Sequence, residues 1–119
     1  GSDIAVQTTT LDEYVKDNNL SSIDLIKCDV EGHELEVFQG GRDTLKQFKP
    51  VVMFECEARH NGPENVMAVF DYLFSLNYKG CFYNGHSFAD LDQFDLVKYQ
   101  TGPNRKIYVN NFFFTPKGT

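Results

Sequence analysis

Two short acidic segments carry the residue types most able to do chemistry, and the first is Asp29–Glu34 (DVEGHE). Three carboxylates and the imidazole of His33 lie within six residues of one another around Gly32, which permits a tight turn. Crowding of like charges raises the pKa of at least one carboxyl group, as a general base requires. The alternative is that Glu31 and Glu34 stabilise the N-terminus of a following helix. Asp29 is not explained in that way.

The second acidic segment is Glu55–His60 (ECEARH), which also follows an apolar run. Glu55 and Glu57 have the spacing of residues on one face of a strand, with Arg59 close behind. The alternative here is a solvated strand end that holds one internal ion pair. Carboxylates such as those of Asp29 and Glu55 could hold a hard divalent cation. Nothing in the spacing requires a metal, and none is predicted.

Apolar patterns predict the elements that position these two segments. Residues 23–28 indicate a strand, and residues 33–48 indicate a helix that bends at Gly40-Gly41. Residues 51–54 are apolar on both faces, which is typical of a parallel strand covered by helices on each side. The helix that follows this strand is predicted to begin at Pro63. Its predicted core-facing residues are Val66, Met67, Phe70, Leu73 and Phe74.

The two ends of the chain are predicted from weaker signals. Residues 4–9 indicate a short extended segment, and the capping-box spacing of Thr10 and Glu13 starts a helix that runs to about Asn18. Residues 78–83 indicate a strand, residues 84–106 an irregular excursion, and residues 107–115 a last strand. Because no helix precedes this last strand, we expect it to run antiparallel.

The alternation of strands and helices predicts an α/β fold, with mostly parallel strands, an antiparallel last strand and helices on both faces. In open sheets of this kind, sites form at the carboxyl ends of the strands, where both acidic segments lie. The chain has 119 residues, which suits a single domain over residues 3–119. Gly1-Ser2 has the composition of a residual cleavage tag.

Composition excludes several classes of function. The net charge of −6 argues against nucleic acid or an anionic membrane as the main partner. Cys28, Cys56 and Cys81 form no CxxC pair, which predicts neither a zinc site nor a disulfide framework and favours a reducing, cytoplasmic setting. No phosphate-binding glycine loop and no nucleophile elbow occur in the sequence.

The run IDLIKCDVEGHELEVFQGG (residues 23–41), followed by KPVVMFECE (residues 49–57), resembles the FkbM family of S-adenosylmethionine-dependent methyltransferases. TTLDEY (residues 9–14) and NNFFFTPK (residues 110–117) are similar to the segments that open and close the same pattern. The residues that match the family pattern are Lys27, Asp29, Val30, Glu31, Gly32, Glu34, Gly40, Phe54 and Glu55.

This resemblance implies the C-terminal portion of a Rossmann-like class I methyltransferase sheet. The parent protein would methylate a hydroxyl group of a sugar, polyketide or other small molecule. S-adenosylmethionine would be bound mainly by a glycine loop and a ribose-binding acid that precede this chain, and the isolated chain would be inactive. The resemblance implies that Asp29 faces both cofactor and acceptor. Glu31 and His33 would bind the acceptor or remove its proton, and Glu55 and Glu57 would line the acceptor side.

Two other functions are compatible with the same residues. The chain could be a non-catalytic α/β interaction domain, or a hydrolase with Mg²⁺ or Mn²⁺ on Asp29 and Glu55. A sheet without its preceding strands would expose the edge of the strand at residues 23–28. We therefore expect either that residues 4–9 fold over this edge or that two chains pair there.

Overall fold

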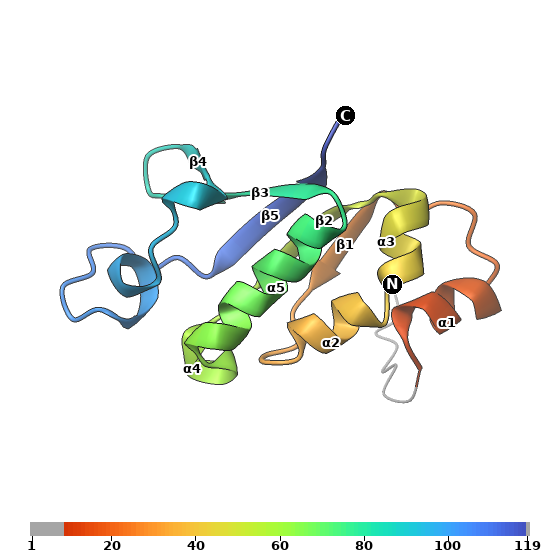
Figure 1. The fold of residues 1–119 in the computed structure, drawn as a ribbon, viewed down its shortest axis with the longest axis horizontal. Helices are drawn as coiled ribbons and strands as arrows, with labels where there is room; N and C mark the ends of the chain where they lie inside the picture. The colour runs from red at the N-terminus through yellow and green to blue at the C-terminus, as the bar shows by residue number, and fades with distance from the viewer. Residues whose placement is uncertain (1–8, 119) are drawn as a thin grey trace.

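The computed structural model describes residues 9–118, and a five-stranded mixed sheet forms its centre (Figure 1). The strand order is β1-β2-β5-β3-β4, with β1 and β2 parallel and each of the other neighbouring pairs antiparallel. The strands are β1 (Leu25–Cys28), β2 (Val51–Glu55), β3 (Tyr78–Tyr83), β4 (Phe88–Asp90) and β5 (Asn111–Pro116). The expected antiparallel direction of the last strand is confirmed. Strands β1, β2 and β3 run in the same direction, as expected, but β5 inserts between β2 and β3, so only β1 and β2 pair as parallel neighbours.

Five α-helices accompany the described strands, and two of them replace one predicted helix. The helix expected at residues 33–48 is divided at Gly40-Gly41, where the bend was expected. Helix α1 packs closely against this break, since a Cβ atom on Gly41 would lie 2.6 Å from Cδ2 of Leu11. The helices are α1 (Leu11–Asp17), α2 (Glu34–Gln39), α3 (Arg42–Phe48), α4 (Ala58–Asn61) and α5 (Pro63–Ser75). The predicted capping box of Thr10 and Glu13 opens α1.

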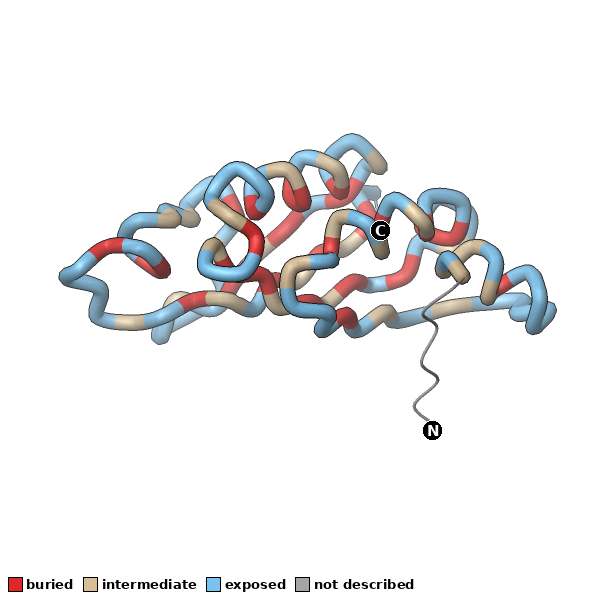
Figure 2. Tube along the Cα trace, turned by 90° about the horizontal axis from the view of Figure 1, so that it is seen from below, coloured by how far each residue is buried: buried red, intermediate tan, exposed pale blue. Residues whose placement is uncertain are grey.

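The helices form one layer over one face of the sheet, and buried residues concentrate between the two layers (Figure 2). Val52 and Phe54 of β2 face this core, and Phe54 packs against the rings of Phe38 and Phe114 at centroid distances of 5.2 and 5.6 Å. The prediction of helices on both faces is therefore wrong for the described residues. The strand residues that alternate with these core residues lie on the other face of the sheet, and some of their apolar side chains are exposed. Leu25 of β1, for example, has 54% of its surface accessible.

Helix α5 begins at Pro63, as predicted, and covers the centre of the sheet. Val66, Phe70 and Leu73 are fully buried, as expected for one stripe of a helix. Met67 and Phe74 were predicted to face the core but remain exposed. They lie at the margins of that stripe, where the layer of helices ends. No helix in the described part of the chain is long and apolar enough to cross a membrane.

The segment at residues 84–106 is more ordered than predicted. It holds strand β4, a 3₁₀ turn η1 (Leu91–Gln93) and a π-helical turn η2 (Val97–Thr101). Tyr99 and Gln100 of η2 are buried, so this turn packs against the end of the sheet where β2 finishes. The last strand begins at Asn111 rather than at residue 107, and residues 102–110 connect η2 with β5.

Strand β1 lies at one edge of the sheet, and its exposed Leu25 offers a test of the expected chain pairing. The expectation that residues 4–9 cover this edge falls almost wholly outside the described residues. A charge on an edge strand opposes strand addition, so we expect Leu25→Lys to weaken any self-association of the chain. Sedimentation velocity over a concentration series measures this change. Leu20→Lys, at an exposed residue before the strand, is the matched control. Equal association of both variants would exclude pairing through β1.

Candidate active site

The parallel pairing of β1 and β2 brings two predicted site residues together. Cys28 is in register with Phe54, so Asp29 and Glu55 occupy neighbouring positions at the carboxyl ends of the two strands. Loss of hydration raises the pKa of Glu55, and the charge of Asp29 together with a hydrogen bond between the two carboxyl groups raises it further. The neighbouring carboxylate therefore favours the protonated form of Glu55.

The turn after Asp29 requires its glycine. Glu31 and Gly32 both have left-handed backbone conformations, with φ of +31° and +96°. A Cβ atom on Gly32 would lie 3.2 Å from the backbone oxygen of His60, which is close for a carbon contact. The strained turn therefore lies directly against α4, and it brings residues of the first acidic segment close to the second.

The side chain of Glu34 stabilises this turn. Its side chain is fully buried, and its two carboxylate oxygens accept hydrogen bonds from the backbone N–H of Gly32 (3.1 Å) and from Nδ2 of Asn61 (3.0 Å). Asn61 also donates to the backbone oxygen of Glu57 (3.1 Å). This network ties the turn after β1 to the helix after β2. Glu34 was predicted as one of three crowded carboxylates or as a helix-end charge, so its linking role was missed.

A narrow cleft of about 10 Å³ lies between the two strand ends, with room for about one water molecule. Of the predicted site residues, the structure brings four to this cleft and leaves His33 outside. The ring of His33 is exposed instead and lies 3.4 Å from Oε1 of Glu36 on the surface of α2. The residues that line the cleft are Asp29, Glu31, Gly32, Glu34, Glu55, Glu57, His60 and Asn61.

Glu57 is buried and interacts with two side chains, one close to it in the sequence and one distant. It accepts hydrogen bonds from the hydroxyl of Tyr108 and from Nε of Arg59, the latter at 2.8 Å. Partial dehydration opposes ionisation of Glu57, but these hydrogen bonds outweigh it and lower the pKa of this carboxyl group. Partial burial and the contact with Glu57 raise the pKa of Tyr108 to about 12. Glu57 therefore stays ionised and Tyr108 stays protonated at neutral pH.

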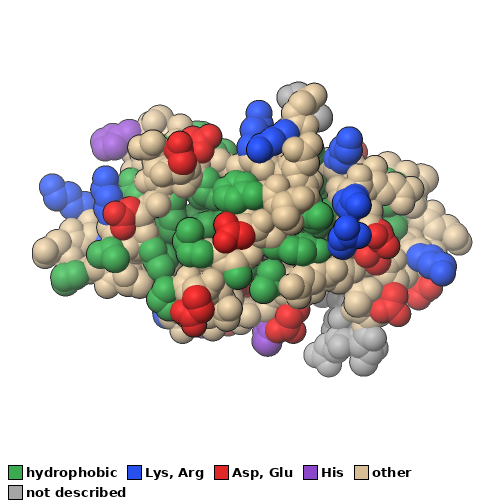
Figure 3. Space-filling view, in the orientation of Figure 1, with side chains coloured by type: hydrophobic (Ala, Val, Ile, Leu, Met, Phe, Trp, Pro, Cys, Tyr) green, Lys and Arg blue, Asp and Glu red, His purple; other side chains and the backbone are tan. Residues whose placement is uncertain are grey.

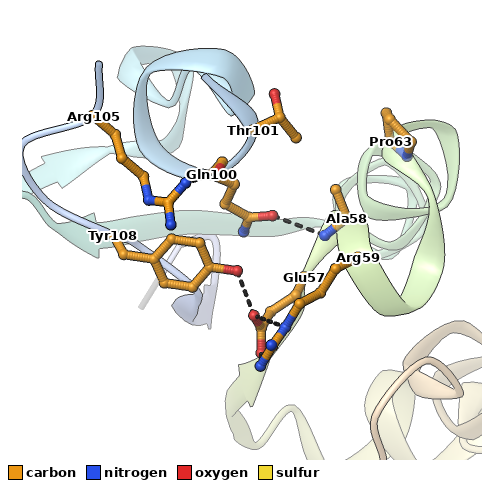
Figure 4. Close-up of a pocket in the computed structure, with 8 residues that line it drawn as sticks. All are labelled: Glu57, Ala58, Arg59, Pro63, Gln100, Thr101, Arg105 and Tyr108. Atoms are coloured by element: carbon orange, nitrogen blue, oxygen red, sulfur yellow. Dashed lines mark hydrogen bonds and ion pairs between the residues drawn. The ribbon is translucent and has the colours of Figure 1, made fainter. Parts of the chain in front are cut away.

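A larger pocket of about 510 Å³ opens on the other side of Glu57, between α4 and η2 (Figure 4). The side chain of Gln100 forms part of its wall and is fixed by three backbone groups. It accepts from the N–H of Ala58 (2.8 Å) and donates to the carbonyls of Cys56 and Val109, both at 2.9 Å. Sequence reasoning missed this pocket, because its walls come from distant parts of the chain.

The remaining candidates for site chemistry are the metal ligands and the thiols. In residues 9–118, no three His, Cys, Asp or Glu side chains are grouped so that they could hold a metal ion. Burial, with smaller contributions from Glu34 and Asp29, raises the pKa of Cys28 to about 12. Burial raises the pKa of Cys56 as well. Both thiols pack in the core as small hydrophobes, and neither is activated as a nucleophile.

The carboxyl pair predicts a dependence of stability on pH. Because the pKa of Glu55 is raised by folding, the folded state loses stability as pH rises from the ordinary value of 4.5 toward neutrality. We expect Glu55→Gln to remove this loss and to increase the free energy of unfolding at pH 7 by about 0.2–1 kcal/mol. Urea unfolding at pH 7 and at pH 4 measures the difference, which should shrink in acid.

The control for this experiment is Asp71→Asn, which makes the same change of charge on the exposed side of α5. It should alter the free energy of unfolding less than Glu55→Gln does. A gain from Glu55→Gln that is as large at pH 4 as at pH 7 would contradict electrostatic crowding at the cleft.

The family described as the methyltransferase FkbM domain matches residues 1–94. A protein named 2-O-methyltransferase NoeI, from Sinorhizobium fredii (strain NBRC 101917 / NGR234), is 34% identical over 71 residues. The match covers 59% of this chain and 29% of that protein. No solved structure matches significantly. Since the family match covers most of the sequence, including both acidic segments, the chain belongs to the methyltransferase FkbM domain family.

Proposed function

We propose that this chain forms part of an S-adenosylmethionine-dependent O-methyltransferase that acts on a hydroxyl group of a sugar or another small molecule. The matched relative is named a 2-O-methyltransferase, and the chain spans less than a third of its length. The observation that carries the proposal is the carboxyl pair of Asp29 and Glu55 at adjoining strand ends. The sheet of this chain is proposed to be the C-terminal portion of a Rossmann-like sheet.

The chemical need for such a pair is a proton acceptor. The bond from the methyl carbon to the donor's sulfur would break as the acceptor oxygen bonds to that carbon, and the hydrogen of the acceptor oxygen must leave as a proton. Asp29 is the proposed base, with Glu55 beside it to share the proton and to hold the hydroxyl group. Glu31 and Glu57 line the same cleft and are proposed to orient the acceptor. The role of His33 stays a prediction, since its ring contacts Glu36 instead.

S-adenosylmethionine would supply the methyl group, and the described residues do not fit the whole of it. The cleft at Asp29 measures about 10 Å³, and the neighbouring hollow beside Lys27 and Met53 about 130 Å³. Neither encloses a nucleoside. Only Asp29 is therefore proposed to approach the cofactor, and the adenosine-binding residues are proposed to lie in another part of the parent protein.

Isothermal titration with S-adenosylmethionine tests this division of the site. The 119-residue chain should bind weakly or not at all, because several oriented hydrogen bonds worth about 1–3 kcal/mol each are lacking. The full-length protein should bind and should transfer a labelled methyl group to polyhydroxylated acceptors. Low-micromolar binding by the chain would show that its site is complete. Absence of methyl transfer by a full-length protein that binds the cofactor would count against the proposed activity.

A further inference from the structure

The pocket between α4 and η2 is not needed for proton removal, yet it adjoins the cleft where that step is proposed. Glu57 lines both the cleft and the pocket, so the two hollows adjoin on either side of this side chain. Figure 4 shows Arg59 and Arg105 at opposite ends of the contact between Tyr108 and Glu57. We call this hollow the Arg105 pocket. The residues that line it are Glu57, Ala58, Arg59, Pro63, Gln100, Thr101, Arg105 and Tyr108.

The hydrogen-bond acceptors that Glu57 and Gln100 present on the wall of the Arg105 pocket already have partners. Glu57 accepts from Tyr108 and Arg59, and the side-chain oxygen of Gln100 accepts from the N–H of Ala58. The backbone oxygen of Gln100 accepts from Nη1 of Arg105 at 2.9 Å. A ligand that needs acceptors, such as an amine or another cation, therefore finds little on this wall that is not already in use.

The hydrogen-bond donors of the pocket, in contrast, are not all in use. Arg105 donates one described hydrogen bond from its Nη1, and its guanidinium group lies 4.9 Å from the ring centroid of Tyr108. A guanidinium group has five N–H donors in a planar fork that suits carboxylate and phosphate oxygens. Arg59 donates from Nε and Nη2 to Glu57, and 71% of its side-chain surface is accessible. Two guanidinium groups with donors to spare thus border one pocket that holds a single carboxylate.

The segment of the chain that contains Arg105 is also positively charged. The chain carries a net charge of −6, but residues 96–119 contain four basic side chains and no acidic one. Two of these basic residues, Lys98 and Lys106, line a second hollow that shares Arg105 with the first. Figure 3 shows Lys and Arg side chains at the end of the molecule that η2 and the loop after it form, with Asp and Glu side chains nearby. Asp95 precedes η2 and Lys117 follows the far end of β5, so the positive charge that an anion meets at this end comes from Lys98, Arg105 and Lys106.

We propose that the Arg105 pocket binds an anionic group, a carboxylate or a phosphate, that the acceptor molecule carries. The assignment to an acceptor rests on the proposed methyl transfer, whereas anion binding by the pocket does not. The anionic group would lie between Arg59 and Arg105, and the hydroxyl group to be methylated would extend past Glu57 to the cleft. The pocket would thereby select charged acceptors over neutral ones of the same shape.

Titration of the 119-residue chain, followed by ¹H–¹⁵N NMR, tests the pocket without any methyl transfer. The probes are glucose 6-phosphate, glucuronate and glucose at low ionic strength. We expect both charged sugars to shift the amide signals around η2 and α4, with at least tenfold weaker binding of glucose. Arg105→Gln should weaken binding of the charged sugars by tenfold or more, and Arg105→Lys should weaken it less. Binding of all charged probes should fall as NaCl is added.

Arg42→Gln is the matched control, because Arg42 lies on α3, is exposed and lines neither hollow that contains Arg105. It should leave the affinities unchanged. Arg59→Gln provides a second variant if Arg105→Gln melts at a lower temperature than the wild-type chain. Equal binding of glucose and its charged relatives, or no effect of either arginine variant, would overturn the proposal.

Assays of the full-length protein separate this proposal from the proposed function. Methyl transfer that shows no preference for charged acceptors would reject the pocket's role and leave the activity intact. Anion binding by the chain without methyl transfer in the full-length protein would reject the activity and leave the pocket. A lower KM for charged acceptors that Arg105→Gln abolishes, with kcat little changed, would support both.

Discussion

Asp29→Asn in the full-length enzyme is expected to lower turnover by about 10²-fold or more, while the fold and much of the cofactor affinity are kept. The amide has the size of the carboxylate but cannot accept a proton. It also removes the charge that helps to raise the pKa of Glu55, so the neighbouring group does not replace the lost base. Steady-state kcat with labelled methyl donor, together with the Kd of S-adenosylmethionine, measures the effect.

Asp24→Asn is the matched control, because Asp24 precedes the same strand β1 at its other end and is exposed. Its turnover should equal that of the wild type. Glu31→Gln should have an intermediate effect, since Glu31 lines the cleft, and His33→Asn should have little, since His33 does not. Normal turnover in all three variants of the acidic turn would show that the turn is structural and that the base lies elsewhere.

The part of the site that could be predicted from the sequence depends on local patterns. Asp29 directly follows an apolar strand, and Glu55 ends the next one. Parallel strands that are adjacent in the sequence usually pair, so their carboxyl ends lie side by side. The capping box of α1 and the break at Gly40-Gly41 are local in the same sense. Each depends on residues within one turn of a helix or on the absence of a Cβ atom.

The rest of the site depends on contacts between distant residues, which no local pattern encodes. Tyr108 lies 51 residues from the Glu57 that it contacts, and Gln100 lies 42 residues from Ala58. Gln100 comes from polar sequence that shows no helical or strand periodicity, so residues 84–106 were predicted to be irregular, whereas Tyr108 lies in the segment that was predicted as the last strand. The insertion of β5 between β2 and β3 has the same origin, since strand order is set by packing of whole elements rather than by any one strand.

The apolar faces of β2 show a different limit of sequence reasoning. The continuous apolar run at residues 51–54 predicts that both faces of this strand are apolar. Val52 and Phe54 are indeed buried under helices. The pattern cannot say which element covers the other face, where the described part of the chain provides no helix. Met67 shows the same limit on a helix, because a period of 3.6 residues defines a stripe but not its width.

Asn61→Asp is expected to lower the free energy of unfolding by about 2–4 kcal/mol at pH 7. The side chain of Asn61 is buried, and its Nδ2 donates to Glu34 and to the backbone oxygen of Glu57. The aspartate has nearly the same shape, but it replaces two donors with acceptors. It would also place a second carboxyl group 3.0 Å from that of Glu34, where both side chains are buried. Both effects act in the same direction.

The sign of the pH dependence distinguishes this account from a simple packing defect. Two carboxyl groups at this distance favour a shared proton in the folded state, so folding raises the pKa of the pair. The destabilisation should be largest at neutral pH and should decrease as pH falls through about 4, because the bridging proton restores a donor. Asn65→Asp, which makes the same substitution at an exposed position of α5, should change the stability little at either pH.

Urea unfolding at pH 7 and pH 4 measures the free energies, and hydrogen exchange measures the local consequence. The N–H of Gly32 donates to Glu34, so a loosened Glu34 should let this amide exchange faster while amides in the core of α5 respond only through global stability. Wild-type stability of Asn61→Asp at pH 7 would mean that the contact between Glu34 and Asn61 does not hold the turn. A loss of stability that is equal at both pH values would trace the effect to packing, and the turn after β1 would then owe its geometry to Gly32 alone.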